Sequence, residues 1–66
     1  MQMSIETRQQ IKAQIQALRL YADDSTLTMR LRDGYVQIVA GNCAVSDEYP
    51  ASDWRQAFRS VREVYA

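Results

Sequence analysis

The amino-acid sequence predicts a small α+β domain in which a helix, three antiparallel strands and a second helix follow one another along residues 1–66. Three observations support this fold class. An apolar stripe with helical spacing begins after Ser4, an alternating hairpin pattern covers residues 26–40, and a second helical stripe follows Pro50. Because both stripes and one hairpin face are apolar, we expect both helices to pack on one face of a three-stranded meander.

The first helix is expected to begin at Ser4, a favourable N-cap, with Glu6 in the first turn where the helix dipole favours an anion. Asp23-Asp24-Ser25 favours a turn and is expected to end the helix. The apolar stripe consists of Ile11, Ile15, Leu18 and Ala22, widened by Ala17, Leu20 and Tyr21.

The central hairpin is predicted by turn chemistry and by alternation independently. Asp33-Gly34 suits a two-residue turn that needs positive φ at both positions. This turn places Arg32 opposite Tyr35 and brings the apolar residues of both strands to one side. The inward-facing pairs are Leu31 with Val36, Met29 with Ile38, and Leu27 with Ala40.

A third strand is expected from Cys43 to about Ser46, after a second tight turn at Gly41-Asn42. In simple register Cys43 and Val45 point inward. The same register would bury Asp47, so we expect the strand to end or bulge near Ser46.

The second helix shows the clearest periodicity of the chain. Tyr49-Pro50 is expected to break the strand, after which Ser52 caps the helix and Asp53 lies in its first turn. The apolar positions are Trp54, Ala57, Phe58, Val61, Val64 and Tyr65.

Composition limits the classes of function. Eight basic residues balance eight acidic ones, which argues against binding of polyanions by bulk charge. Cys43 is the only cysteine, so no intramolecular disulfide can form, which suits a reducing compartment. The sequence has neither the pattern of a signal peptide nor an apolar run long enough for a membrane span, and we expect a cytoplasmic protein.

The order of the elements resembles that of the double-stranded-RNA-binding domain and of small toxins built on the same plan. The RNA-binding family implies a lysine-rich start to the second helix, where this chain has Ser52-Asp53-Trp54-Arg55. The toxins imply a catalytic histidine, and this chain has none. The resemblance therefore concerns architecture and does not transfer either function.

No enzymatic activity, cofactor or metal site is expected. The two glycines, Gly34 and Gly41, are both needed for turns, which leaves none for a phosphate-binding loop. Without a histidine to activate it, Cys43 is interpreted as a small core residue. The acidic pairs Asp23-Asp24 and Asp47-Glu48 lack the ligand spacing that marks a metal site.

Two sets of residues are candidates for binding a partner. Arg55, Arg59 and Arg62 recur at i, i+4 and i+7 on the second helix and form an arginine ridge away from its apolar stripe. The alternative is an ordinary solvated face, with Glu63 close enough to pair weakly with Arg59. The outer face of the sheet offers Arg30, Arg32 and Tyr35, with Arg32 and Tyr35 as a cross-strand stacking pair, or it is simply hydrated. This face is expected to carry Thr28, Arg30, Arg32, Tyr35, Gln37, Val39 and Ala44, together with Ser46 and Glu48 if the third strand extends that far.

These features favour a non-enzymatic protein interaction module that occupies a surface on a larger protein. In size, balanced charge, and display of arginine and aromatic residues, the chain is similar in type to the small α/β inhibitors that phages and other mobile elements make against host defence, including anti-CRISPR proteins. One alternative is a small nucleic-acid-binding module that uses the arginine ridge, with Lys12, Arg30 and Arg32. Another is a homodimeric accessory subunit.

Overall fold

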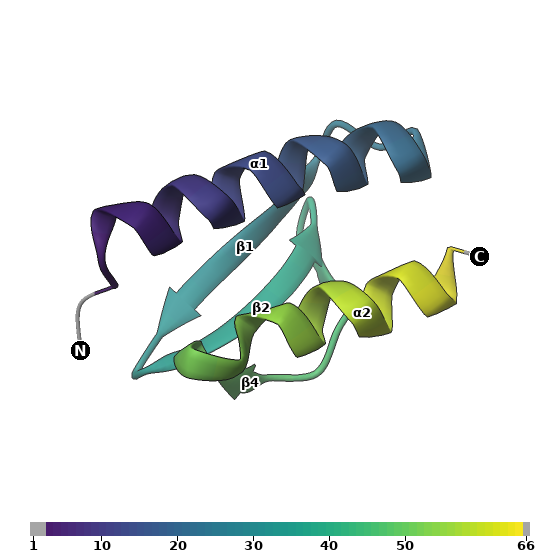
Figure 1. Cartoon of the computed structure of the whole chain (residues 1–66). Helices are drawn as coiled ribbons and strands as arrows, with labels where there is room; N and C mark the ends of the chain where they lie inside the picture. Colours follow the sequence, from purple (N-terminus) through teal and green to yellow (C-terminus); the bar gives the residue numbers. More distant parts are fainter. Residues whose placement is uncertain (1–2, 66) are drawn as a thin grey trace.

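The computed structural model describes residues 3–65, which form an antiparallel sheet with two α-helices on one face. Figure 1 shows α1 along the top and α2 lower and in front of the sheet, both running from left to right. The predicted α+β class and the packing of both helices on the sheet are confirmed. The elements in chain order are α1 (Ile5–Ala22), β1 (Leu27–Arg32), β2 (Tyr35–Ala40), β3 (Cys43–Ala44), β4 (Tyr49–Pro50), the 3₁₀ turn η1 (Ala51–Asp53) and α2 (Trp54–Val64). Within residues 3–65, neither helix is long and apolar enough to cross a membrane.

α1 begins and ends where the sequence predicts. The backbone N–H of Thr7 donates to Ser4 Oγ at 3.1 Å, and Asp23 ends the helix in the left-handed conformation with φ of 52°. Ile15 and Leu18 are buried against the sheet, with Ile11 and Ala22 packed at the edge of the core.

The predicted widening of the α1 stripe is wrong. Leu20 is 85% exposed, Tyr21 is 56% exposed, and Ala17 is also exposed. At about 100° per residue, Leu20 lies roughly 180° around the helix from Ile11, on the side away from the sheet. Apolar character at that position therefore did not indicate burial.

The hairpin has the predicted register throughout, from Arg32 opposite Tyr35 to Leu27 opposite Ala40. Asp33 and Gly34 have φ of 53° and 80°, as a two-residue hairpin turn requires. The fully buried hairpin residues are Leu27, Val36 and Ile38, whereas Leu31, next to the turn, is 44% exposed.

The third strand is interrupted at the position where the sequence predicts an end or a bulge. β3 pairs with the end of β2 and β4 pairs with its beginning, so the four residues 45–48 face only Gln37 and Ile38. Inside this bulge, Ser46 Oγ accepts the backbone N–H of Ile38 at 2.9 Å. Asp47 is thereby left exposed rather than buried.

Two expectations about this third strand are wrong. Cys43 is exposed, because it lies at the end of the sheet while the helices pack on β1, β2 and β4. Tyr49-Pro50 forms the short strand β4 instead of breaking the strand. Proline is tolerated there because this is an edge of the sheet, where the missing N–H removes no ladder hydrogen bond.

α2 covers the middle of the sheet, but its start differs from the expected cap. Ser52 lies inside the 3₁₀ turn, and among residues 3–65 no side chain caps η1 or α2 by a hydrogen bond. The backbone N–H of Ala51 instead donates to the Gly34 carbonyl at 2.8 Å, which ties the start of the helix to the hairpin turn. Four residues of the predicted stripe, Trp54, Ala57, Phe58 and Val61, are buried, whereas Val64 is 69% exposed.

Candidate partner-binding surfaces

The arginine ridge of α2 faces the glutamines of α1. Because the apolar stripe of α2 packs on the sheet, Arg55, Arg59 and Arg62 lie on its exposed flank. Arg55 Nη2 donates to Gln10 Oε1 at 3.2 Å, and Arg62 Nη2 donates to Gln14 Oε1 at 3.1 Å. The ridge therefore borders the seam between the two helices, and two of its three side chains are held by α1.

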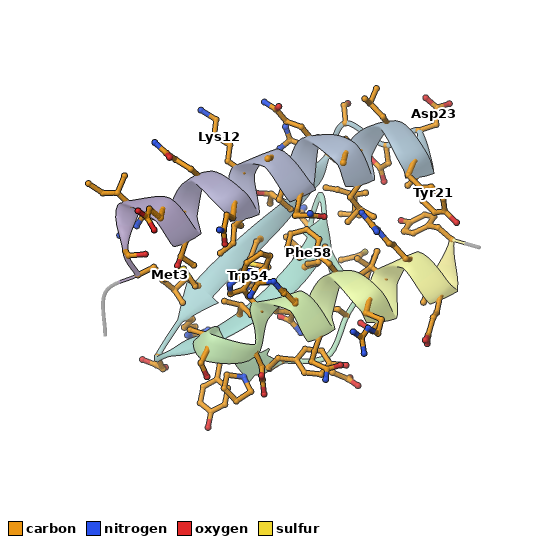
Figure 2. All side chains as sticks on the ribbon, viewed as in Figure 1. Met3, Lys12, Tyr21, Asp23, Trp54 and Phe58 are labelled. Atoms are coloured by element: carbon orange, nitrogen blue, oxygen red, sulfur yellow. The ribbon has the colours of Figure 1, made fainter. Side chains whose placement is uncertain are left out.

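The start of the ridge rests on the aromatic core. The Cζ atom of Arg55 lies 4.3 Å from the centroid of the Trp54 ring, a cation–π geometry. Trp54 in turn meets Phe58 edge to face, with ring centroids 5.7 Å apart and planes at 87°. Figure 2 shows both rings between α1, α2 and the sheet. The packing that fixes Trp54 therefore also orients Arg55.

The charges of the ridge are not neutralised by neighbouring carboxylates. A groove of about 420 Å³ is lined by the three arginines, Trp54, Phe58, Gln14 and Glu63. Within residues 3–65, no carboxylate oxygen lies within 4.0 Å of a ridge guanidinium nitrogen, so the Arg59–Glu63 pair expected of a solvated face does not form. Glutamine partners hold Arg55 and Arg62 in place but leave their positive charges intact.

The outer face of the sheet carries Arg30, Arg32 and Tyr35 as predicted, but its charges are more nearly balanced. Arg32 Nε lies 3.8 Å from Asp33 Oδ2. Glu48, from the bulged third strand, joins these residues around a hollow of about 30 Å³, close to the size of one water molecule. Arg32 and Tyr35 are opposite each other in register, but within residues 3–65 no cation–π contact forms between them.

One residue expected on this outer face is buried. Val39 is only 5% exposed, although it lies outside the main core cluster. The face around it is consequently less apolar than the alternation of the strand predicts.

The six candidate residues do not form one surface. The ridge lies on the helical side of the molecule, whereas Arg30, Arg32 and Tyr35 lie on the face of the sheet that the helices leave uncovered. Sequence reasoning missed the contribution of Gln10 and Gln14. Their partners are Arg55 and Arg62, which lie seven residues apart, whereas the two glutamines lie four apart, so no common spacing in the sequence indicated these contacts.

The remaining chemically active side chains do not assemble into a site. Asp24 accepts hydrogen bonds from the side chain and the backbone N–H of Thr26, at 2.6 and 2.9 Å, and these bonds hold the pKa of its carboxyl below the usual value. These contacts continue the turn that Asp23 begins. Over the described range 3–65, no group of three Cys, Asp or Glu side chains gathers where it could hold a metal ion.

Comparisons with models of protein families, with curated proteins and with solved structures give no significant match. The two surfaces are therefore interpreted from their own chemistry. The ridge combines oriented guanidinium groups with an adjoining groove of about 420 Å³, and among residues 3–65 it has no carboxylate partner. On the outer sheet face, Arg32 has Asp33 beside it, and Glu48 lines both the small hollow and a neighbouring one of about 320 Å³. Of the two, the ridge is the better candidate for binding a partner.

Proposed function

We propose that this protein is a non-enzymatic interaction module that occupies an acidic surface on a larger protein through its arginine ridge. The observation that carries the proposal is the arrangement of Arg55, Arg59 and Arg62 along the helical seam without a carboxylate partner among residues 3–65. A guanidinium group offers planar, bidentate donors that match carboxylates. Three such groups within two turns of one helix provide a defined row of contacts for an acidic patch.

The ridge is partly organised before a partner arrives. The Trp54 ring and Gln10 restrict Arg55, and Gln14 restricts Arg62. Ordering a free, rotamer-rich side chain at an interface costs roughly 0.5–1.5 kcal/mol, so prior restraint preserves affinity. Arg59 makes no side-chain hydrogen bond within residues 3–65, and all its donors can turn toward a partner.

The distribution of charge favours a protein partner over nucleic acid. The chain has a formal net charge of zero, and its eight cations lie in three separate places: the ridge on α2, then Arg8, Lys12 and Arg19 on α1, and Arg30 and Arg32 on the outer face of the sheet. Affinity for a phosphate backbone increases with the number of phosphates neutralised together. Three arginines with Glu63 beside them make a small footprint for that purpose.

The size of the chain fits a role in blocking access to a surface. A standard interface buries roughly 800 Å² on each partner, whereas the whole chain exposes 4726 Å². A bound molecule would thus give up a substantial share of its surface and cover a comparable area of the target. Inhibition of a host-defence complex, in the manner of small phage inhibitors, is one specific form of this proposal, and an accessory homodimer is the alternative that uses the outer sheet face.

Affinity capture followed by a salt series tests the proposal. The tagged protein is used to capture binding proteins, and the affinity for each captured protein and for duplex DNA and RNA is then measured at two salt concentrations. We expect an acidic protein to be captured and to bind with modest salt dependence. Binding to nucleic acid that falls by orders of magnitude between low and moderate salt would support the alternative, and a molar mass of twice the monomer without another partner would support the homodimer.

A further inference from the structure

The outer edge of β1 carries backbone groups that have no strand partner within residues 3–65, because β1 pairs with β2 along one edge only. The hairpin has a two-residue turn, so the adjoining pair, Arg32 and Tyr35, exchanges backbone hydrogen bonds. The alternation of an antiparallel ladder then turns the N–H and C=O groups of Met29 and Leu31 away from β2.

Two contacts agree with this alternation. Leu27 lies two residues before Met29, so its carbonyl also points away from β2. This carbonyl accepts a hydrogen bond from Arg19 Nε at 2.7 Å. Ile38, opposite Met29 in β2, likewise turns its N–H and C=O away from β1, toward the interrupted third strand. Arg19 therefore occupies the first open position of the edge, and the positions of Met29 and Leu31 stay free among residues 3–65.

A groove of about 380 Å³ runs along this open edge, between β1 and α1. Figure 2 shows Met3 between the start of α1 and the end of β1, with Lys12 projecting from the outer side of the helix. No acidic side chain of residues 3–65 lines the groove. Beside the exposed edge residues, its lining includes the apolar side chains Met3, Ile11 and Ile15 and the cations Arg8, Lys12 and Arg19.

We propose that this edge groove binds an extended acidic segment of a partner protein, which pairs with β1 as an added strand. Backbone pairing at Met29 and Leu31 would supply the affinity, as in other cases of strand addition. At about 3.3 Å per residue, a segment of four or five residues reaches both positions. Arg8 and Lys12 select for carboxylates on the segment, and the apolar lining accepts alternate apolar side chains.

A second copy of this chain suits the groove less well. Pairing β1 with the same strand of another molecule would bring Arg30 and Arg32 from both copies together on the outer face of the joined sheet, and Arg8 and Lys12 from both copies toward the same junction on its helical face. Such a concentration of like charge opposes association. Cations on an exposed strand edge can also serve only to prevent pairing with other chains. In that case no acidic peptide would bind the groove.

The test begins with a displayed library of random twelve-residue peptides selected against the whole protein. We expect the enriched peptides to combine carboxylates with alternating apolar residues. Adding one of them should slow hydrogen exchange at the amides of Met29 and Leu31, and replacing its Glu and Asp by Gln and Asn should weaken binding about tenfold. Failure to enrich acidic peptides, or protection confined to the arginine ridge, would overturn the proposal.

Two substitutions and a modified peptide distinguish strand addition from contact with side chains alone. Leu31→Pro removes an outward N–H without breaking the β1–β2 ladder, whereas its control, Leu31→Ala, shortens the same side chain but keeps that donor. We expect Leu31→Pro to weaken binding about tenfold and Leu31→Ala less than about threefold.

An N-methyl scan of the peptide on the unaltered protein gives the same information if Leu31→Pro fails to fold. Methylation of a peptide N–H should abolish binding only at every second residue, because only those N–H groups face β1 in an antiparallel ladder. Equal tolerance at every position would contradict strand pairing. A molar mass that doubles with concentration and returns to the monomer value on addition of the peptide would show that a second copy competes for the edge, contrary to the proposed occupant.

Discussion

The guanidinium group of Arg55 lies over the Trp54 ring, with 4.3 Å between Cζ and the ring centroid. The Nη2 atom of the same arginine donates to Gln10 across the seam between the helices. Arg55 thus contacts its own helix through Trp54 and α1 through Gln10, and both contacts hold one end of the arginine ridge.

Arg55→Ala should destabilise the fold more than Arg59→Ala. Arg55 would lose a cation–π contact of about 0.5–1 kcal/mol at an exposed site and a hydrogen bond to Gln10. Arg59→Ala should change stability by less than about 0.5 kcal/mol, as is usual for an exposed side chain without partners. Urea unfolding of both variants measures the difference. Equal midpoints would show that Trp54 and Gln10 do not hold Arg55.

Phe58→Ala should cost about 3–5 kcal/mol, as truncation of a buried aromatic residue does. Phe58 is 4% exposed and packs edge to face on Trp54. Val64→Ala on the same helix is the control and should cost less than about 0.5 kcal/mol, because Val64 is 69% exposed. Denaturant unfolding compares the two, and a Phe58→Ala protein of near-normal stability would mean that α2 does not pack as described.

Gly34→Val should destabilise the fold more than Gly41→Ala, although both changes should be unfavourable. The φ angles are 80° and 60°, and a Cβ atom would meet nothing within 4 Å at either glycine. The cost is therefore conformational, about 1–2 kcal/mol for an ordinary residue in this region and more for a β-branched one. Gly34→Asn is the control, because asparagine tolerates positive φ. Denaturant unfolding should give a higher midpoint for Gly34→Asn than for Gly34→Val. A higher midpoint for Gly34→Val would contradict a turn with positive φ at this position.

Protonation of Asp24 should destabilise the fold at acid pH. Hydrogen bonds from the Thr26 side chain and backbone lower the pKa of this carboxyl from its ordinary value of 3.8. A pKa lowered by folding means that the contribution is complete above pH 3.8, decreases as the pH falls toward the folded pKa, and is absent below it. Carbon-detected NMR titration of Asp24 measures the pKa, which should rise in Thr26→Val. An unchanged titration in that variant would exclude the hydroxyl as the main cause.

The hairpin could be predicted to the residue because two independent signals coincide. Asp33-Gly34 sets the turn, and the alternation on both sides sets the same register, which the structure confirms. The bulge of the third strand was also foreseeable, since unbroken pairing would have buried Asp47. The sequence did not indicate that Ser46 Oγ would accept the backbone N–H of Ile38, because this contact depends on the three-dimensional course of the loop.

The candidate site could be predicted only in part from the sequence. The period of the arginines indicated the ridge, but the ridge meets Gln10 and Gln14, whose relation to α2 depends on how the helices pack. The open edge of β1 was not evident either. Alternation shows which side chains face the core, but it does not say which of two strand edges is left unpaired.

The most direct test of the proposed function is the affinity of a charge-reversed ridge for the captured protein partner. Arg55→Glu, Arg59→Glu and Arg62→Glu are combined in one variant, and Arg30→Glu with Arg32→Glu on the outer sheet face serve as the control. Circular dichroism establishes that both variants fold. We expect the ridge variant to bind at least about tenfold more weakly than the unaltered protein, because repulsion replaces attraction at three points, and the control to bind within about threefold. Unchanged affinity of the ridge variant, or a greater loss in the control, would contradict binding through the arginine ridge.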